Sequence, residues 1–266
     1  MSWLTRASRE AARLMQPLVP REGGGVTILA YHLVGGGTPS VVDLPIETFH
    51  AQLRELRQIA HVCSLTEAVS RLEAGTDRTR PAVVITFDDG FDNFRTRAWP
   101  LLRELDVPCT LYVPVGFIEG TRPAPLTGAE RLRPLEWAAL RELASEPLLT
   151  IGSHGCRHQD LRRLDLDDVR QDLRHSRARL QDRTGAPIDH FCYPQAKWSR
   201  AIEQEVRAEY RTAVVAGGRT NVPGRFNPQR LWRVPVRRDM PSGLTPVVQS
   251  AVWLEEWAAS HARALT

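Results

Sequence analysis

Seven short apolar runs recur along this chain, and segments with helical periodicity separate them. Most of the runs are continuously apolar rather than alternating, which is typical of parallel strands covered on both faces. Strands that alternate with helices predict βαβ units, and seven of them favour a closed or nearly closed α/β barrel over an open doubly wound sheet. The predicted strands are Val26–Tyr31, Val83–Phe87, Thr110–Val113, Leu148–Gly152, His190–Tyr193, Thr212–Ala216 and Leu231–Val236.

The segments between these runs predict amphipathic helices. A further amphipathic helix, residues 1–22, precedes a Gly23-Gly24-Gly25 linker, so we expect the barrel domain to span residues 23–266. Basic residues flank the apolar stripe of that helix, so it could contact a membrane surface through residues 1–20 or pack on its own domain. The other predicted helices are Ile46–Ala60, Leu65–Glu73, Asn93–Leu105, Leu135–Ala144, Leu166–Arg183, Arg200–Glu209 and a closing helix over Leu244–Ala264.

Composition excludes several classes of protein. A chain of 266 residues, 42% of them hydrophobic, can bury a sizeable core. The net charge of +4 comes from dispersed arginines interleaved with acids, which indicates a solvated surface and no nucleic-acid partner. The four cysteines form no CxxC pair, so we expect no disulfide. No segment has the ~20 apolar residues of a membrane span or the core of a signal peptide. We therefore expect a cytoplasmic protein, either free or peripheral to the inner membrane face.

Polar residues that could take part in catalysis or metal binding follow four of the predicted strands. His32 follows the first strand and the Asp88-Asp89 pair the second, whereas His154 ends the fourth and Tyr193-Pro194 the fifth. Active sites of α/β barrels lie at the carboxyl ends of the strands. The sequence therefore predicts that these residues line one pocket.

The residue types in this pocket indicate a metal site. Two adjacent carboxylates disfavour joint ionisation unless a metal or a shared proton relieves them. His154 and His158 present two imidazoles four residues apart. One carboxylate and two imidazoles would suit Zn²⁺ most, with Co²⁺, Ni²⁺ or Mn²⁺ as alternatives. His32 is a candidate general acid because the ordinary pKa of histidine lies near neutrality. A phosphoryl-transfer site is disfavoured, since no glycine-rich phosphate loop lies near Asp88.

Three motifs in this order resemble the polysaccharide deacetylase family, the carbohydrate esterases with NodB homology. They are residues 86–90 (TFDDG), 153–158 (SHGCRH) and 191–194 (FCYP). The resemblance covers roughly residues 26–240, and the opening segment 29–32 (LAYH) is similar to the branch acting on poly-N-acetylglucosamine exopolysaccharides. It implies a distorted (β/α)7 barrel.

The resemblance also implies roles for individual residues. Asp88 would be the general base and His32 the general acid, while Asp89 would bind the metal with His154 and His158. The loop of Tyr193 and Pro194 would line the site, with the Tyr193 backbone N–H facing the oxyanion. The expected reaction removes N-acetyl groups from an amino-sugar polymer or glycoconjugate in exopolysaccharide or cell-envelope metabolism.

The chain also departs from the family pattern. Cys192 stands where many relatives carry an arginine that pairs with the base, and Arg233 could supply that cation from the last strand. Asp239 could orient His32, and Trp198 could stack on a sugar ring. Two alternatives stay open: an O-acetyl esterase on the same scaffold, and a non-catalytic protein that keeps its metal and binds a glycan or a biosynthetic partner.

Overall fold

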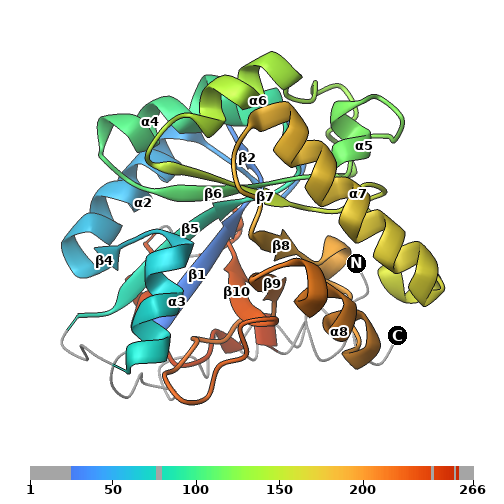
Figure 1. Ribbon diagram of the computed structural model, residues 1–266. Coiled ribbons are helices and arrows are strands. Elements are labelled where there is room, and N and C mark those ends of the chain that lie inside the picture. Colours follow the sequence, from blue (N-terminus) through green and yellow to red (C-terminus); the bar gives the residue numbers. More distant parts are fainter. Residues whose placement is uncertain (1–24, 76–79, 241–242, 255, 258–266) are drawn as a thin grey trace, which may run out of the picture.

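Seven parallel strands close into a barrel in the computed structural model of the protein (Figure 1). The order β1-β10-β9-β8-β7-β6-β5 closes because β1 also pairs with β5 along its whole length. The structure describes residues 25–75, 80–240, 243–254 and 256–257, so the helix predicted over residues 1–22 lies outside the described residues. The barrel strands are β1 (Val26–Tyr31), β5 (Ala82–Phe87), β6 (Cys109–Val113), β7 (Leu149–Ser153), β8 (His190–Cys192), β9 (Thr212–Ala216) and β10 (Leu231–Pro235).

These strands confirm the seven predicted from the apolar runs, with ends that differ by at most one residue. The sequence did not predict three strands of two residues each, which are too short to give an apolar run. Two of them, β2 (Leu33–Val34) and β3 (Asp43–Leu44), pair with each other beside the barrel. The third, β4 (His61–Val62), pairs with the first two residues of β5.

Helices lie outside the strands (Figure 1). The longest, α7, begins where the Asp165 side chain accepts a hydrogen bond from the Asp168 N–H, and it ends at Gly185 in the left-handed conformation. Arginines of α7 bind acids of α8, as in the pair Arg170–Glu205. The helices are α2 (Ile46–Ile59), α3 (Leu65–Ala74), α4 (Trp99–Glu104), α5 (Val115–Ile118), α6 (Trp137–Ala144), α7 (Leu166–Thr184), α8 (Arg200–Glu209) and α9 (Thr245–Val248).

Two helix predictions were wrong in extent. The closing helix predicted over Leu244–Ala264 is interrupted, because α9 ends at Val248 and the Trp253 N–H donates instead to the Gly218 carbonyl. The helix predicted over Asn93–Leu105 consists of a π-helical turn, η2 (Phe94–Ala98), followed by α4. The side chain of Asn93 bonds both backbone groups of Val34 at the start of this turn, which ties the turn to β2 beside the barrel.

The barrel interior is built in layers because alternate residues of each strand point inward. The lower layer is apolar, and α3 closes the barrel beneath it through Leu65, Ala68, Val69 and Leu72. The layer above it, toward the carboxyl ends of the strands, contains Thr86 of β5, Cys192 of β8 and Arg233 of β10. All three side chains are buried. A polar layer therefore lies directly beneath the carboxyl ends of the strands. The lower layer contains Val26, Ile28, Val84, Val214 and Leu231.

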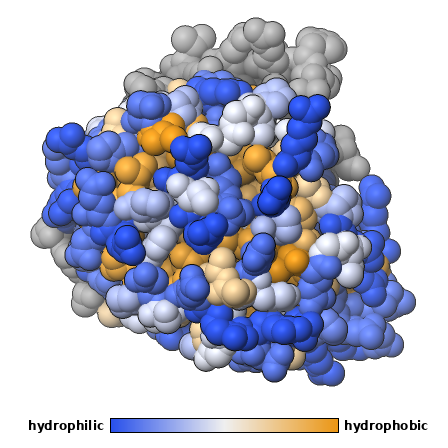
Figure 2. All heavy atoms as spheres, turned by 90° about the horizontal axis from the view of Figure 1, so that it is seen from above, coloured by the Kyte–Doolittle hydropathy of each residue, from blue (hydrophilic) through white to orange (hydrophobic). Residues whose placement is uncertain are grey.

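The outer surface is mostly hydrophilic. Figure 2 shows the molecule from the top of the view in Figure 1. On that face, hydrophobic residues form small separate patches among hydrophilic ones, which is usual for a solvated surface. Within the described ranges, no helix combines the length and the apolar character needed to cross a membrane. All four cysteines are free thiols.

Candidate active site

The carboxyl ends of the strands surround a cleft of about 330 Å³. The structure brings together in this cleft seven of the residues that the sequence singled out. The loop between α5 and α6 contributes Pro125 and Leu126 to the rim, and Gln195 and Ala196 form part of the wall. The seven predicted residues that line this cleft are His32, Asp88, Asp89, His154, His158, Tyr193 and Arg233.

Asp89, His154 and His158 form a cluster with the geometry of a metal site. Asp89 Oδ1 lies 3.7 Å from His154 Nε2 and 3.4 Å from His158 Nε2, and one ligand atom from each residue lies within 4.8 Å of the others. The Nδ1 of His154 donates to the Cys192 carbonyl at 2.8 Å. That hydrogen bond fixes the tautomer and leaves the Nε2 lone pair for a ligand bond.

The charges around this cluster suit a divalent cation. Burial lowers the pKa of His154 to about 4, and burial together with His154 lowers the pKa of His158 to about 3, so both rings are neutral near pH 7. Burial and the charge of Asp88 raise the pKa of Asp89 well above its ordinary value. A buried carboxylate of this kind requires a cation in order to ionise. The donor set of one carboxylate and two imidazoles therefore fits Zn²⁺ or a similar ion.

Asp88 is held by a buried arginine. Arg233 Nη1 donates to Asp88 Oδ1 and Nη2 donates to Oδ2, both at 2.7 Å, and Nη1 also donates to Thr86 Oγ1 at 2.9 Å. Burial alone would raise the pKa of Asp88, but the charge and hydrogen bonds of Arg233, with smaller contributions from His154 and His32, hold it well below its usual range. Arg233 of β10 is thus the cation that pairs with Asp88.

The backbone separates the two adjacent carboxylates. Asp89 has a φ of 77° and Gly90 a φ of 64°, both in the left-handed region. A non-glycine residue rarely adopts this conformation except at turns and functional sites. The turn directs the Asp88 side chain to Arg233 inside the barrel and the Asp89 side chain to the two histidines.

Cys192 fills the space beside this ion pair. Its Sγ lies 2.9 Å from Arg233 Nη2, 3.7 Å from Asp88 Oδ2 and 3.9 Å from His154 Nε2. Burial raises the pKa of Cys192 well above its ordinary value, so the side chain is a neutral thiol. Its small volume leaves room for Arg233 to reach Asp88 from β10, which β1 separates from β5.

His32 lies next to Asp88, with its Nε2 3.8 Å from Asp88 Oδ2. Burial lowers the pKa of His32, although the charge of Asp88 opposes this shift. Its Nδ1 has no hydrogen-bonding partner among the described residues. Asp239 does not orient this ring as predicted. It accepts a hydrogen bond from Arg237 Nε at 3.1 Å instead.

The prediction for the Tyr193 backbone was also wrong. Its N–H donates to the Val214 carbonyl at 3.1 Å, because the pairing of β8 with β9 continues one residue beyond Cys192. This N–H is therefore not available to an oxyanion. Tyr193 still lines the cleft, and its hydroxyl donates to the Gln229 carbonyl at 2.9 Å. Pro194 is buried and starts the turn η4 (Pro194–Ala196) that carries the chain along the cleft wall.

Trp198 lies away from the predicted sugar contact. The guanidinium of Arg230 lies 3.8 Å from the centre of its ring, and the residue is not among those that line the cleft. The sequence missed another charged pair in the cleft wall, in which Arg237 Nη1 donates to Glu256 Oε2 at 3.0 Å. Nothing in the local sequence could have joined these two residues. Thr86 could have been found, because it faces the same side of its strand as Asp88.

Comparisons with known proteins agree with this geometry. A family profile described as polysaccharide deacetylase matches residues 75–213, which is more than half of the 266 residues. The match includes Asp88, Asp89, His154 and His158, whereas His32 and Arg233 lie outside it. No curated protein sequence matches the chain.

Solved structures share the fold at low sequence identity. The Streptococcus pyogenes deacetylase PplD, solved in complex with acetate, aligns with a TM-score of 0.73 and 19% identity over 86% of this chain and 99% of its own. IcaB from Ammonifex degensii aligns with a TM-score of 0.69 and 22% identity over 89% and 98% of the two chains. The putative polysaccharide deacetylase BA0330 from Bacillus anthracis gives 0.70 and 18% over 85% and 69%.

Proposed function

Because the profile match spans more than half of its length, the chain belongs to the polysaccharide deacetylase family, and from that premise we propose that it is a metal-dependent hydrolase that removes N-acetyl groups from an amino-sugar polymer. Membership makes it a hydrolase that deacetylates a polysaccharide. The metal, the amide bond and the place of the polymer in exopolysaccharide or cell-envelope metabolism are parts of the proposal. The observation that carries it is the pair of hydrogen bonds from Arg233 to Asp88, next to the cluster of Asp89, His154 and His158.

The proposed cluster would hold a divalent ion through Asp89 Oδ1, His154 Nε2 and His158 Nε2. Such an ion supplies a Lewis acid for the acetyl carbonyl and lowers the pKa of the attacking water. The chain's own residues then handle the protons. Asp88 stays ionised because of Arg233, so it can accept a proton from the attacking water as general base.

His32 would deliver a proton to the departing nitrogen. Burial keeps its ring neutral near pH 7, and its Nε2 lies 3.8 Å from Asp88 Oδ2. The ring can therefore receive the proton that Asp88 has taken from water and pass it to the nitrogen as the C–N bond breaks. The products are acetate and a protonated amino sugar: one proton of the water passes through Asp88 and His32 to the nitrogen, and the new carboxyl group gives the second proton to the amine.

The decisive experiment measures bound metal and acetate release together, with N-acetylated and O-acetylated oligosaccharides as substrates. Asp88→Asn should keep its metal and lose acetate release by roughly 10²–10⁴-fold, the usual contribution of a general base. Asp89→Asn should lose the metal and the activity together. Asp106→Asn is the matched control, since this exposed residue has a φ of 52° that asparagine also tolerates.

Acetate release by Asp88→Asn at the wild-type rate would contradict the role of Asp88. Release from O-acetyl esters alone would replace the proposed amidase with an esterase. A wild-type protein that binds metal but releases no acetate from either substrate class would favour the non-catalytic alternative.

A further inference from the structure

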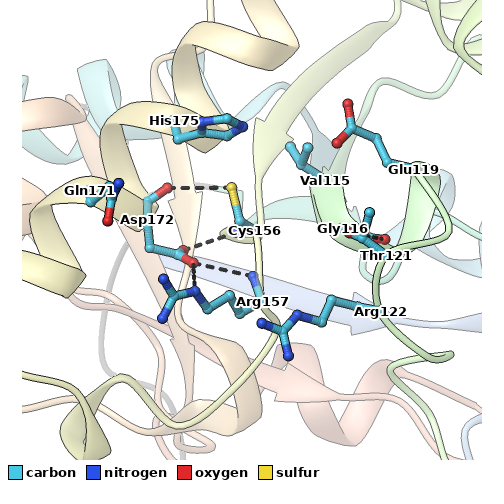
Figure 3. Close-up of a pocket in the computed structure, with 10 residues that line it drawn as sticks. All are labelled: Val115, Gly116, Glu119, Thr121, Arg122, Cys156, Arg157, Gln171, Asp172 and His175. Atoms are coloured by element: carbon cyan, nitrogen blue, oxygen red, sulfur yellow. Dashed lines mark hydrogen bonds and ion pairs between the residues drawn. The ribbon is translucent and has the colours of Figure 1, made fainter.

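We infer that Asp172 is a positioning residue that holds the loop between His154 and His158 in metal-binding geometry, an inference that rests on the proposed metal site. Asp172 lies in α7, on the outer side of that loop. Its Oδ1 accepts a hydrogen bond from the Cys156 N–H at 2.9 Å, and its Oδ2 accepts one from the Arg157 N–H at 3.2 Å (Figure 3). One carboxylate thus binds two consecutive backbone donors of the segment that joins the two histidines.

The backbone of this loop is in the left-handed region at two residues. Gly155 has a φ of 73° and His158 a φ of 44°. Left-handed conformations are unfavourable for a residue with a side chain such as His158, and they persist where the surrounding structure determines them. His158 is one of the proposed ligands, so the contacts that maintain its backbone conformation also maintain the position of its imidazole.

Asp172 packs directly against the loop. Its side chain is buried, and a Cβ at Gly155 would lie only 2.8 Å from Asp172 Oδ1. A second contact comes from the next turn of α7, where Ser176 Oγ accepts a hydrogen bond from Ser153 Oγ at 3.0 Å. Ser153 Oγ in turn accepts the Gly155 N–H at 3.1 Å. The loop is therefore fixed to α7 at three successive N–H groups, two of them through Asp172.

The loop also borders open space. A cavity of about 230 Å³ lies beside Cys156 and Arg157, between Asp172 of α7 on one side and α5 with residues 119–122 on the other (Figure 3). Two backbone hydrogen bonds join the loop to α5, from the Val115 N–H to the Gly155 carbonyl and from the Gly116 N–H to the Cys156 carbonyl. Loss of the carboxylate would leave two N–H groups next to a space into which the loop can relax. Asp172 is for this reason the side chain that holds these two N–H groups, and with them the segment between the two imidazoles, in place.

The test compares metal binding by Asp172→Ala and Asp172→Asn with that of the wild type. Asp168→Asn is the matched control, because this half-exposed carboxylate lies one turn away on α7 and only approaches the Arg157 side chain, at 3.6 Å. The dissociation constant for Zn²⁺ is measured by competition with a chelator, and the ligand geometry is read from the visible spectrum of the Co²⁺ form. Neither readout depends on turnover.

Asp172→Ala should raise the dissociation constant by about 10–100-fold, as loss of groups that orient metal ligands commonly does, and should alter the Co²⁺ spectrum. Asp172→Asn should show a smaller effect, since its amide oxygen retains one of the two acceptors. Wild-type affinity and spectrum in both Asp172 variants would overturn the inference. An equal loss of affinity in Asp168→Asn would also overturn it, because that result would indicate a general charge effect.

If Asp172→Ala does not fold, Asp172→Asn decides the question together with amide hydrogen exchange of residues 155–157, which should accelerate in that variant alone. Failure of the proposed function would give a different result. A wild-type protein that binds Zn²⁺ but releases no acetate contradicts the deacetylase proposal, whereas the affinities of the Asp172 variants still establish or refute the role of Asp172.

Discussion

Replacing Arg233 by methionine would test whether this arginine keeps Asp88 ionised. The two side chains are almost completely buried and share two hydrogen bonds of 2.7 Å. Methionine has a similar length and no charge, so the variant removes the cation without leaving a large void. Breaking a buried pair by removal of one partner costs about 3–5 kcal/mol. For a protein of this size, that loss lowers the melting temperature by roughly 6–20 °C.

The same substitution should change how stability depends on pH. In the wild type the folded-state pKa of Asp88 lies below its unfolded value of about 3.9, so its stabilisation is present above that pH and is lost as the pH falls through the folded-state pKa. In Arg233→Met, burial and Asp89 would raise the pKa of Asp88 instead. The resulting destabilisation is present above the raised pKa and is relieved as the pH falls through it. The difference in the free energy of unfolding between the wild type and Arg233→Met is therefore largest near neutral pH and becomes smaller as the pH falls.

The assay is thermal unfolding of both metal-free proteins between about pH 4 and about pH 8, with acetate release of the metal-loaded forms measured alongside. Arg174→Met is the control, because this arginine is exposed and pairs with Glu209 on the surface. A loss of melting temperature below roughly 2 °C, with no dependence on pH, would refute the reasoning. It would show that Asp88 remains ionised without its arginine.

Three further results are expected. Zn²⁺ binding to the metal-free protein should release protons from Asp89, up to about one per ion and increasingly as the pH is lowered, because the pKa of Asp89 is raised while His154 and His158 are already neutral; a pH indicator that records no release between about pH 5 and about pH 7 would contradict this. Gly152→Ala should destabilise the fold by about 1–3 kcal/mol in denaturant titrations, since its Cβ would lie 2.5 Å from the Tyr112 ring, and a variant as stable as the wild type would exclude that clash. Cys192→Ala should retain acetate release within about tenfold, since the thiol is neutral, and complete inactivity would instead give Cys192 a chemical role.

The strands could be predicted closely because burial on both faces leaves a simple signal. β1 and β9 agree residue for residue with the apolar runs Val26–Tyr31 and Thr212–Ala216. The closing helix could not be predicted, since its interruption depends on a hydrogen bond from Trp253 to Gly218, more than thirty residues away. Helical periodicity alone does not reveal such a contact.

The sequence also predicted some features of the candidate site and not others. His32, Asp88, Asp89 and His154 could be placed together because each follows a strand of a parallel barrel. Arg233 could be named as a candidate partner of Asp88 because Cys192 stands at the usual arginine position, but its two hydrogen bonds to Asp88 depend on the inward direction of both side chains, which only the folded barrel shows. The prediction that the Tyr193 N–H faces an oxyanion was wrong for a related reason. The pairing of β8 with β9 continues to Tyr193, whose N–H donates to the Val214 carbonyl.

Asp88 and Asp89 follow one another in sequence yet depend on two different cations. Arg233 is part of the barrel and holds the first carboxylate permanently, whereas the second faces two neutral imidazoles and requires a cation from solution. Environments that push the pKa values of two neighbouring acids apart are a common basis for distinct catalytic roles. The turn at Asp89, with its φ of 77°, produces this separation here. Removal of the metal by a chelator should therefore abolish acetate release while leaving Asp88 ionised, so that activity returns when the metal is restored without any refolding of the barrel.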